Sequence, residues 1–154
     1  MSHVAWRWAL VSTLAIVAIA YFAMPVRSQE ACAAWKAEMW EDEGGPVLTA
    51  FNCADDAPDA YLNLYCSGGD VWLRYDLAYG AERSLDLDEV RDVIFASGGR
   101  SIVEELHHQA MDGLFANAEP IGGDLLSLLR TGDVLDIRDA DSFYPHRSIS
   151  LAGS

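Results

Sequence analysis

The sequence has few basic residues: ten Lys and Arg stand against 24 Asp and Glu, and Lys36 is the only lysine. All the acids follow residue 29, whereas Arg7 and Arg27 precede it, so residues 29–154 carry eight bases and a formal net charge of −16. Such a surface repels nucleic-acid phosphates and anionic lipid head groups, and no basic stripe with interleaved aromatic residues is present. Nucleic-acid binding is therefore excluded. A solvated acidic surface, or one that meets a cationic partner, is expected.

The sequence also lacks the short motifs of common catalytic sites. No serine has a GxSxG context, no HExxH motif occurs, and the glycine pairs at positions 44, 68, 98 and 122 belong to no phosphate-binding loop. Carboxylates are so numerous that no two of them identify an acid–base pair. We assign no catalytic and no cofactor-binding residue, and we expect no cofactor.

Three segments contain residue types that bind metals, but their spacing is wrong for a site. The first is EELHHQAMD, with Glu104, Glu105, His107, His108 and Asp112. Neighbouring histidines on a strand point to opposite faces, so only one of them can join a given acid. The second and third, DDAPD (55–59) and the segment that holds Asp136, Asp139 and Asp141, lack the glycine and distal glutamate of a calcium loop. We assign no metal ligand and expect solvated turns and a polar strand edge.

One long apolar block, residues 9–24, contains no charge and follows Arg7. A basic head, an apolar centre, a break at Pro25 and a small residue at Ser28 form the order of a secretory signal peptide. A bilayer core of about 30 Å takes about 20 apolar residues, so we expect residues 1–28 to be cleaved; the alternative is a membrane anchor over residues 4–26. Either outcome places residues 29–154 outside the cytoplasm, in the periplasm, secreted, or tethered to the inner membrane.

The chain has three cysteines, Cys32, Cys53 and Cys66. An oxidising compartment favours disulfides, and Cys53 and Cys66 each lie at or near the end of a strand-like run. Adjacent antiparallel strands would bring these two within bonding distance, so we predict a Cys53–Cys66 disulfide. Cys32 is then free, bonded to another chain, or paired with a cysteine beyond Ser154. No zinc-finger spacing is present.

Period-two alternation predicts two β-hairpins. The first covers residues 60–77 with its turn at Gly68 and Gly69, and the second covers residues 89–106 with its turn at Gly98 and Gly99. A helix over residues 84–95, capped by Ser84 or Asp86, competes with the second hairpin. The aromatic side chains in and near these segments are expected to lie mainly in the core: Trp72, Tyr75, Tyr79, Phe95, Phe115 and Phe143.

Further patterns predict the remaining elements. Strands are expected over residues 46–54, 133–140 and 146–153, and after a turn at Asp112 and Gly113. Residues 122–133 predict a short helix with Asp124 as its cap, and residues 55–60 predict a loop. Residues 31–45 predict either a short helix or a turn-rich segment. The resulting fold class is mainly β, an antiparallel sandwich or open barrel of six to seven short strands with one short helix, forming one domain over residues 29–154.

The order of several segments resembles a known group of proteins. Cys32 and Trp35 lie early, LNLYCSGGDVWLRYD and MDGLFA follow, and LLRTGDVLDI and ISLAGS end the chain. Across residues 32–154 this layout resembles small exported β-sandwich proteins of alphaproteobacteria, in the same broad group as invasion-associated locus B proteins and the type VI secretion accessory protein VasI. The resemblance implies a compact, disulfide-bearing, non-catalytic domain. In such proteins a terminal helix with a last cysteine commonly follows a Gly-Ser like that at 153–154, which leaves the pairing of Cys32 open.

These observations favour a non-enzymatic exported module that contacts another protein through sheet edges and an acidic surface. A membrane-tethered accessory subunit of an inner-membrane complex is a variant of the same hypothesis. A secreted hydrolase is the alternative, although no active site can be located in the sequence.

Overall fold

The computed structural model of the 154-residue chain describes residues 32–42, 44–76, 89–142 and 144–154. The leader predicted at residues 1–28 lies outside these ranges, as do Tyr79 and Phe143. None of the helices in the described ranges is both long enough and apolar enough to cross a bilayer.

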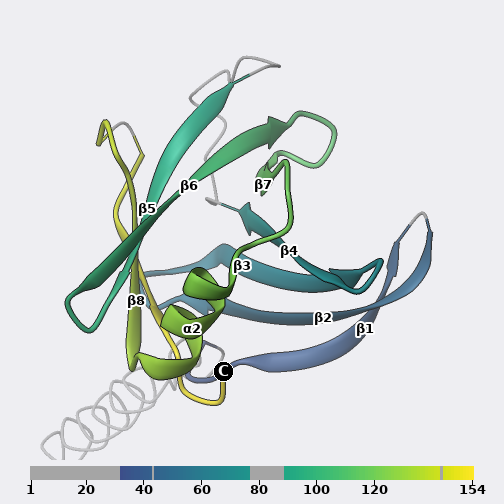
Figure 1. Cartoon of the computed structure of the whole chain (residues 1–154), viewed down its shortest axis with the longest axis horizontal. Helices are drawn as coiled ribbons and strands as arrows, with labels where there is room; N and C mark the ends of the chain where they lie inside the picture. The colour runs from purple at the N-terminus through teal and green to yellow at the C-terminus, as the bar shows by residue number, and fades with distance from the viewer. Residues whose placement is uncertain (1–31, 43, 77–88, 143) are drawn as a thin grey trace, which may run out of the picture.

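The described part of the chain forms one nine-stranded antiparallel sheet and one short helix (Figure 1). The elements are β1 (Lys36–Asp42), β2 (Gly45–Ala54), β3 (Ala57–Ser67), β4 (Asp70–Asp76), β5 (Val90–Ser97), β6 (Arg100–Gln109), β7 (Leu114–Asn117), α2 (Gly123–Thr131), β8 (Val134–Asp139) and β9 (Arg147–Ser150). The prediction of a mainly β fold with one short helix is confirmed.

The sheet closes on itself as an eight-stranded barrel. Its strands follow the order β1-β2-β3-β4-β7-β6-β5-β8-β9, and Ala54 of β2 pairs with Ile149 of β9 to close the ring. The prediction of a sandwich or open barrel with six to seven strands is therefore wrong. Closure depends on a pairing between the second strand and the last, which local alternation does not specify.

Strand β1 is the one strand of the described sheet that stays outside the ring. β1 pairs with residues 45–51 of β2. β9 pairs with the same edge of β2, but at Ala54. The predicted helix or turn-rich segment at residues 31–45 is wrong. The apolar spacing of Trp35 and Met39 suggested a helix, but pairing with β2 satisfies the backbone of this segment as a strand.

Both predicted hairpins are confirmed. Ser67 pairs with Asp70 across the first turn, and Ser97 pairs with Arg100 across the second. The two glycines between them have φ of 65° and 94° in the first turn and 57° and 80° in the second. Positive φ at both central residues is the geometry that joins twisted strands through two residues, and glycine adopts it without strain. Residue 77 at the end of the first hairpin lies outside the described residues.

The other predicted elements are largely confirmed. Strands β2, β7, β8 and β9 lie where alternation predicted strands, and α2 lies within the predicted helical segment. The loop expected at residues 55–60 shrinks to a turn, since β3 already begins at Ala57. Gly122, without a side-chain cap, precedes α2, so the predicted cap Asp124 instead lies in the first turn, where a carboxylate favours the helix dipole.

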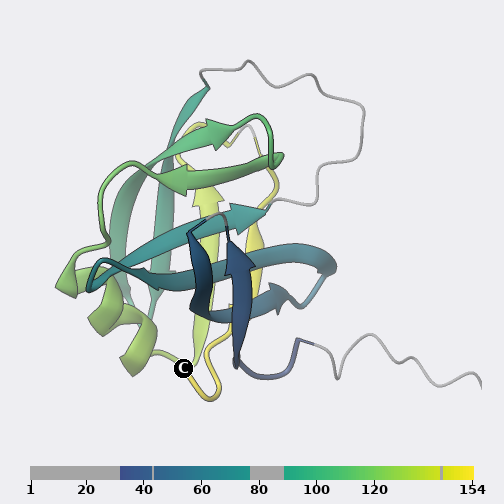
Figure 2. The same ribbon diagram turned by 90° about the vertical axis from the view of Figure 1, so that its right-hand side faces the viewer.

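The barrel interior is filled by apolar side chains. Its largest fully buried members are Tyr75, Phe95, Phe115, Leu62, Leu73, Leu106, Leu125, Leu128, Leu135, Ile137 and Ile149. Eight strands enclose a space that side chains just fill. The cavity beside Tyr75 and Phe115 measures only about 10 Å³, about the room of one water. The buried leucines of α2 belong to this core. The helix itself lies at one end of the barrel (Figure 2).

Candidate functional site

The structure contains a disulfide between Cys32 and Cys53, with their Cα atoms 4.9 Å apart, and Cys66 is a free, exposed thiol. The predicted Cys53–Cys66 disulfide is therefore wrong. Cys53 pairs in register with Tyr61, so Cys66 lies five residues further along β3. At about 3.3 Å per residue this separates the two cysteines by about 16 Å, far beyond bonding distance. A disulfide in the folded chain indicates a thiol-oxidising compartment.

The segments that suggested metal ligands form no metal site among the described residues. On β6, His107 Nε2 lies 3.1 Å from Glu105 Oε1, whereas the ring of His108 packs 5.4 Å from that of Phe115. Asp112 is exposed in the turn that follows β6. Within this segment His107 and Glu105 contact each other, and the two histidines have different surroundings.

The aspartates of the second and third segments contact basic side chains and hydrogen-bond donors of the protein itself. Asp56 forms an ion pair with Arg147 at 3.0 Å. Asp136 accepts one hydrogen bond from Ser148 Oγ at 2.8 Å and contacts His146 Nε2 at 3.2 Å. Asp139 is 5 % exposed and accepts hydrogen bonds from the backbone N–H groups of Asp141 and Tyr144. These carboxylates thus hold together the ends of β8 and β9 and the turns beside them.

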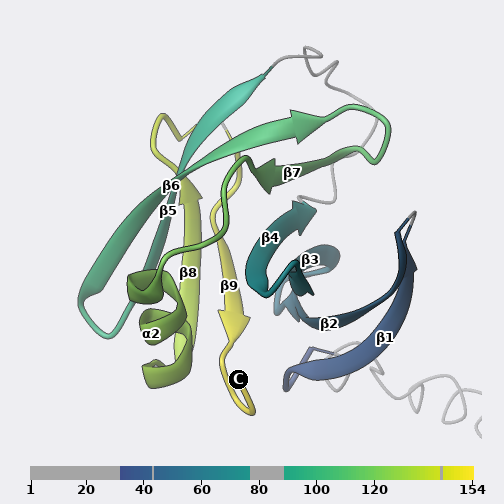
Figure 3. The ribbon, with the colours of Figure 1, turned by 45° about the vertical axis from the view of Figure 1, so that its right-hand side comes forward.

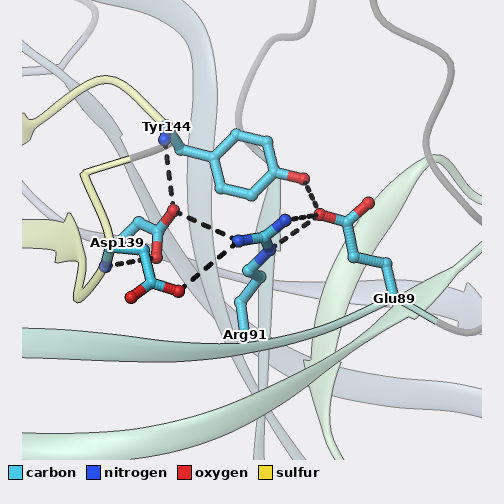
Figure 4. Close-up of polar contacts among 5 residues, drawn as sticks. Glu89, Arg91, Asp139 and Tyr144 are labelled. Carbon is cyan, nitrogen blue, oxygen red and sulfur yellow. Dashed lines mark hydrogen bonds and ion pairs between the residues drawn. The ribbon is translucent and has the colours of Figure 1, made fainter.

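A cluster of charged side chains surrounds Arg91 where β5 begins (Figure 4). Arg91 lies 2.6 Å from Glu89 Oε1, 4.0 Å from Asp139 and 3.8 Å from Asp141. Tyr144 donates its hydroxyl to Glu89 at 2.6 Å, and its backbone N–H donates to Asp139 at 3.2 Å. The cluster therefore ties the β8–β9 connection to the start of β5.

Two opposing effects act on the pKa of Arg91. Burial works to lower it, but the hydrogen bond and negative charge of Glu89 outweigh burial, and the pKa of Arg91 is raised above its ordinary value. Arg91 is therefore charged at neutral pH. Because Glu89, Asp139 and Asp141 all lie within 4.0 Å of its guanidinium, we interpret the cluster as structural.

Glu104 on β6 yields a first testable prediction. Burial raises the pKa of its carboxyl. A carboxylic acid whose folded-state pKa exceeds its unfolded-state pKa destabilises the fold where it is ionised, and this cost vanishes as pH falls below both values. Glu104→Gln should therefore increase stability at pH 7 by no more than about 0.5 kcal/mol and leave it unchanged near pH 3.

Thermal unfolding at the two pH values measures this effect. Glu119→Gln is the matched control, because Glu119 is exposed and its replacement should change stability at neither pH. A gain at pH 3 as large as that at pH 7 would contradict ionisation of Glu104 as the cause.

The most distinctive surface of the described residues is the β1 edge. β1 pairs with β2 along one side only, so its other side carries backbone N–H and C=O groups with no strand partner in the described sheet. Met39 is 61 % exposed and Trp40 is 38 % exposed on this strand. Exposed edges with apolar side chains are sites where a further strand can add.

An outer layer of rings lies beside this edge, and we call it the aromatic face: Trp40, Phe51, Tyr61, Tyr65 and Trp72. The rings of Trp40 and Phe51 are 5.1 Å apart, and those of Phe51 and Tyr61 are 6.5 Å apart, so a continuous series crosses β1, β2 and β3. The Arg74 guanidinium lies 4.4 Å over the Tyr65 ring and pairs with Asp42 at 3.2 Å. Tyr, Trp and Arg are the side chains most enriched at the energetic centres of protein interfaces.

The sequence offered only part of the signal for this surface. Trp72 was assigned to the core, but it lies half-exposed on the aromatic face, whereas Tyr75, Phe95 and Phe115 are core residues as predicted. The position of β1 outside the ring was not predicted, because residues 31–45 were not recognised as a strand. In comparisons with known proteins, the chain matches no family model, no curated protein and no solved structure.

Proposed function

We propose that this domain is a non-enzymatic exported module that binds an extended, basic segment of another protein at the β1 edge. The observation that carries the proposal is the single pairing of β1 in the described sheet, which leaves a row of its backbone donors and acceptors without a partner among the described strands, beside exposed Met39 and Trp40. Addition of a strand there would extend the nine-stranded sheet by one.

Charge on β1 defines the chemistry of the partner. Glu38 and Glu41 are exposed on this strand, and the chain as a whole has a net charge of −14. A partner strand with Lys or Arg opposite these acids and with apolar residues beside Trp40 complements the edge, and opposite charges across a strand pair favour the pairing. The aromatic face then supplies rigid rings to pack against the partner.

The compartment belongs to the same proposal. The Cys32–Cys53 disulfide supports export, and we place the module in the periplasm or at the cell envelope, free after leader cleavage or tethered by residues 4–26. Kinship with the exported group that includes invasion-associated locus B proteins and VasI is likewise proposed, on the segment order described above, although the closed barrel differs from the sandwich that this kinship implied.

Site-specific photo-crosslinking in the producing cells tests the proposal. A photoreactive phenylalanine at Met39 should yield one discrete protein adduct, and the same group at Val103 on β6, which is similarly exposed at 57 %, should yield none. Glu38→Lys combined with Glu41→Lys should abolish the adduct by repelling a basic segment, and Trp40→Ala should reduce its yield about tenfold. Equal adducts at both positions, or an adduct that survives the charge reversal, would refute the proposal.

A further inference from the structure

Strand β1, with the sequence KAEMWED, presents an edge that a second copy of the same strand can meet. In the described sheet β1 pairs with β2 along one side only, and six of its seven residues are exposed. Figure 3 shows β1 as the outermost ribbon beside the curved β2. A free edge of this kind accepts another strand when the facing side chains are compatible. The sequence of β1 therefore decides whether it can pair with itself.

Symmetry restricts how two β1 strands can pair. A two-fold axis perpendicular to the sheet keeps each side chain on its own face, so residues that lie opposite each other must be an even number of positions apart in β1. The register centred on Met39 obeys this rule and pairs all seven residues of the strand. It sets Met39 opposite its own copy, Lys36 opposite Asp42, Ala37 opposite Glu41, and Glu38 opposite Trp40.

Charge favours this register over its neighbours. A shift of two residues in one direction sets Glu38 opposite Glu38, and a shift in the other direction sets Glu38 opposite Asp42. Both shifts place like charges directly opposite, which destabilises a strand pair, and both leave part of β1 unpaired. The register centred on Met39 instead sets Lys36, the only lysine of the chain, opposite an aspartate. Symmetry repeats this pair of opposite charges at both ends of the strand.

Lys36 and Asp42 can both make this contact. Lys36 is exposed and forms no ion pair with a described residue. Asp42 lies 3.2 Å from Arg74 of its own chain, but its side chain is 30 % exposed, and a carboxylate accepts hydrogen bonds from more than one donor. Lys36 of the second copy can therefore join Arg74 at the same carboxylate.

The other face of β1 supplies apolar contact. Met39 pairs in register with Leu48 of β2, and their side chains are 61 % and 50 % exposed. Pairing centred on Met39 extends this contact into a row across four adjacent strands, two from each copy, in the order Leu48, Met39, Met39, Leu48. No charged residue interrupts the row. Removal of this apolar surface from water stabilises the association of the two copies.

We propose that the protein forms a two-fold symmetric homodimer by antiparallel pairing of β1 with β1 of a second copy, in the register centred on Met39. Because both copies use the same edge, the contact is isologous and closes at two copies. The inference does not rest on the proposed function. Since both concern the β1 edge, the second copy and a basic segment of another protein compete for it.

Disulfide capture tests the pairing. All proteins carry Cys66→Ser, so that the introduced thiol is the only free one, because Cys32 and Cys53 are bonded to each other. Directly opposite residues of an antiparallel pair have Cα atoms about 4.5–5.5 Å apart, which is within the range of a disulfide. With oxidised glutathione, Met39→Cys should therefore form a covalent dimer. Val103→Cys, at a similarly exposed position on β6, should stay monomeric.

Two more introduced thiols test the register. Lys36→Cys mixed with Asp42→Cys should give the mixed disulfide dimer, because these positions lie opposite each other. Neither protein alone should dimerise covalently, since each thiol then lies about 20 Å from its own copy at about 3.3 Å per residue.

Sedimentation equilibrium measures the dimer without a crosslink. Both copies are strongly acidic, so the measurement uses about 0.15 M salt, at which the Debye length is about 8 Å. The parent should show a monomer–dimer equilibrium. Met39→Lys sets two like charges opposite each other at the axis and should weaken association about tenfold or more. Val103→Lys is the matched control and should leave association unchanged. Circular dichroism should show that these variants are folded.

Four outcomes would overturn the proposal. These are a parent that is monomeric at its highest soluble concentration, Met39→Cys that crosslinks no more than Val103→Cys, a dimer that Met39→Lys leaves intact, and a failure of the mixed thiols to pair. The photo-crosslinking experiment keeps the two proposals separate. An adduct between two copies yields peptides of this chain alone, whereas an adduct with a partner yields peptides of another protein.

Discussion

Replacing Arg91 by methionine should lower the free energy of unfolding by about 3 kcal/mol at pH 7. The variant keeps most of the side-chain volume but leaves Glu89 and Asp139 without their cation, and these carboxylates are only 12 % and 2 % exposed. Loss of one partner of a buried ion pair typically costs about 3–5 kcal/mol. The lower end applies because the Arg91 side chain is 20 % exposed.

The pH dependence of this loss identifies its cause. In the variant the uncompensated carboxylates bind protons as pH falls, which removes the buried negative charge, so the loss should be smaller at pH 4 than at pH 7. Urea unfolding of both proteins at the two pH values measures the difference. Arg100→Met is the control, because Arg100 is exposed on neighbouring β6 and forms no ion pair with the described residues. Equal losses in the two variants would contradict the role assigned to the cluster.

Removing the disulfide by Cys32→Ala combined with Cys53→Ala should lower the free energy of unfolding by about 3 kcal/mol. The bond joins residues 21 apart and thereby restricts the unfolded chain. The bond also links the segment before β1 covalently to β2. Cys32 and Cys53 are only 2 % and 3 % exposed, so the bond lies in the interior. Equilibrium unfolding without reductant measures the loss.

Cys66→Ser is the matched control for the disulfide, because Cys66 is exposed and free. Its replacement should leave stability within about 0.5 kcal/mol of the parent. Under denaturing, non-reducing conditions the parent should show one reactive thiol, located at Cys66 by peptide mapping. A peptide that links Cys53 to Cys66 would contradict the structure.

Elements whose signals are local were predictable. Both glycine-pair hairpins, the leucine-rich helix and the strands β2, β8 and β9 follow from alternation, turn chemistry and helical spacing within about 20 residues. Each of these patterns describes how a segment buries one of its faces, whatever lies opposite. These elements can therefore be predicted without knowing which strands they pair with.

The segment of β1 shows where local signals fail. Its apolar residues at four-residue spacing favour a helix, and its acids favour a turn, yet it is a strand because β2 extends beyond the ring and offers an edge to pair with. The open edge and the aromatic face both depend on this pairing. Neither could be located from the sequence.

Cysteine pairing failed for a related reason. Strand runs that end in Cys53 and Cys66 suggested proximity, but the register sets Thr49 opposite Tyr65 and Cys53 opposite Tyr61. Cys66 lies five residues beyond Tyr61, the residue that pairs with Cys53. Because each residue along a strand adds about 3.3 Å, the two cysteines are too far apart to bond. The register follows from packing over the whole barrel.

By itself, the sequence determined an acidic, mainly β domain after an uncharged apolar run at residues 9–24, with two tight hairpins and one short helix, because composition, alternation and glycine turns act over short distances. Only the tertiary structure decided that the sheet closes through Ala54 and Ile149, that Cys32 is the partner of Cys53, and that β1 stays outside the closed ring. These features depend on contacts between residues distant in the chain, whose register is set by the packing of the whole barrel at once.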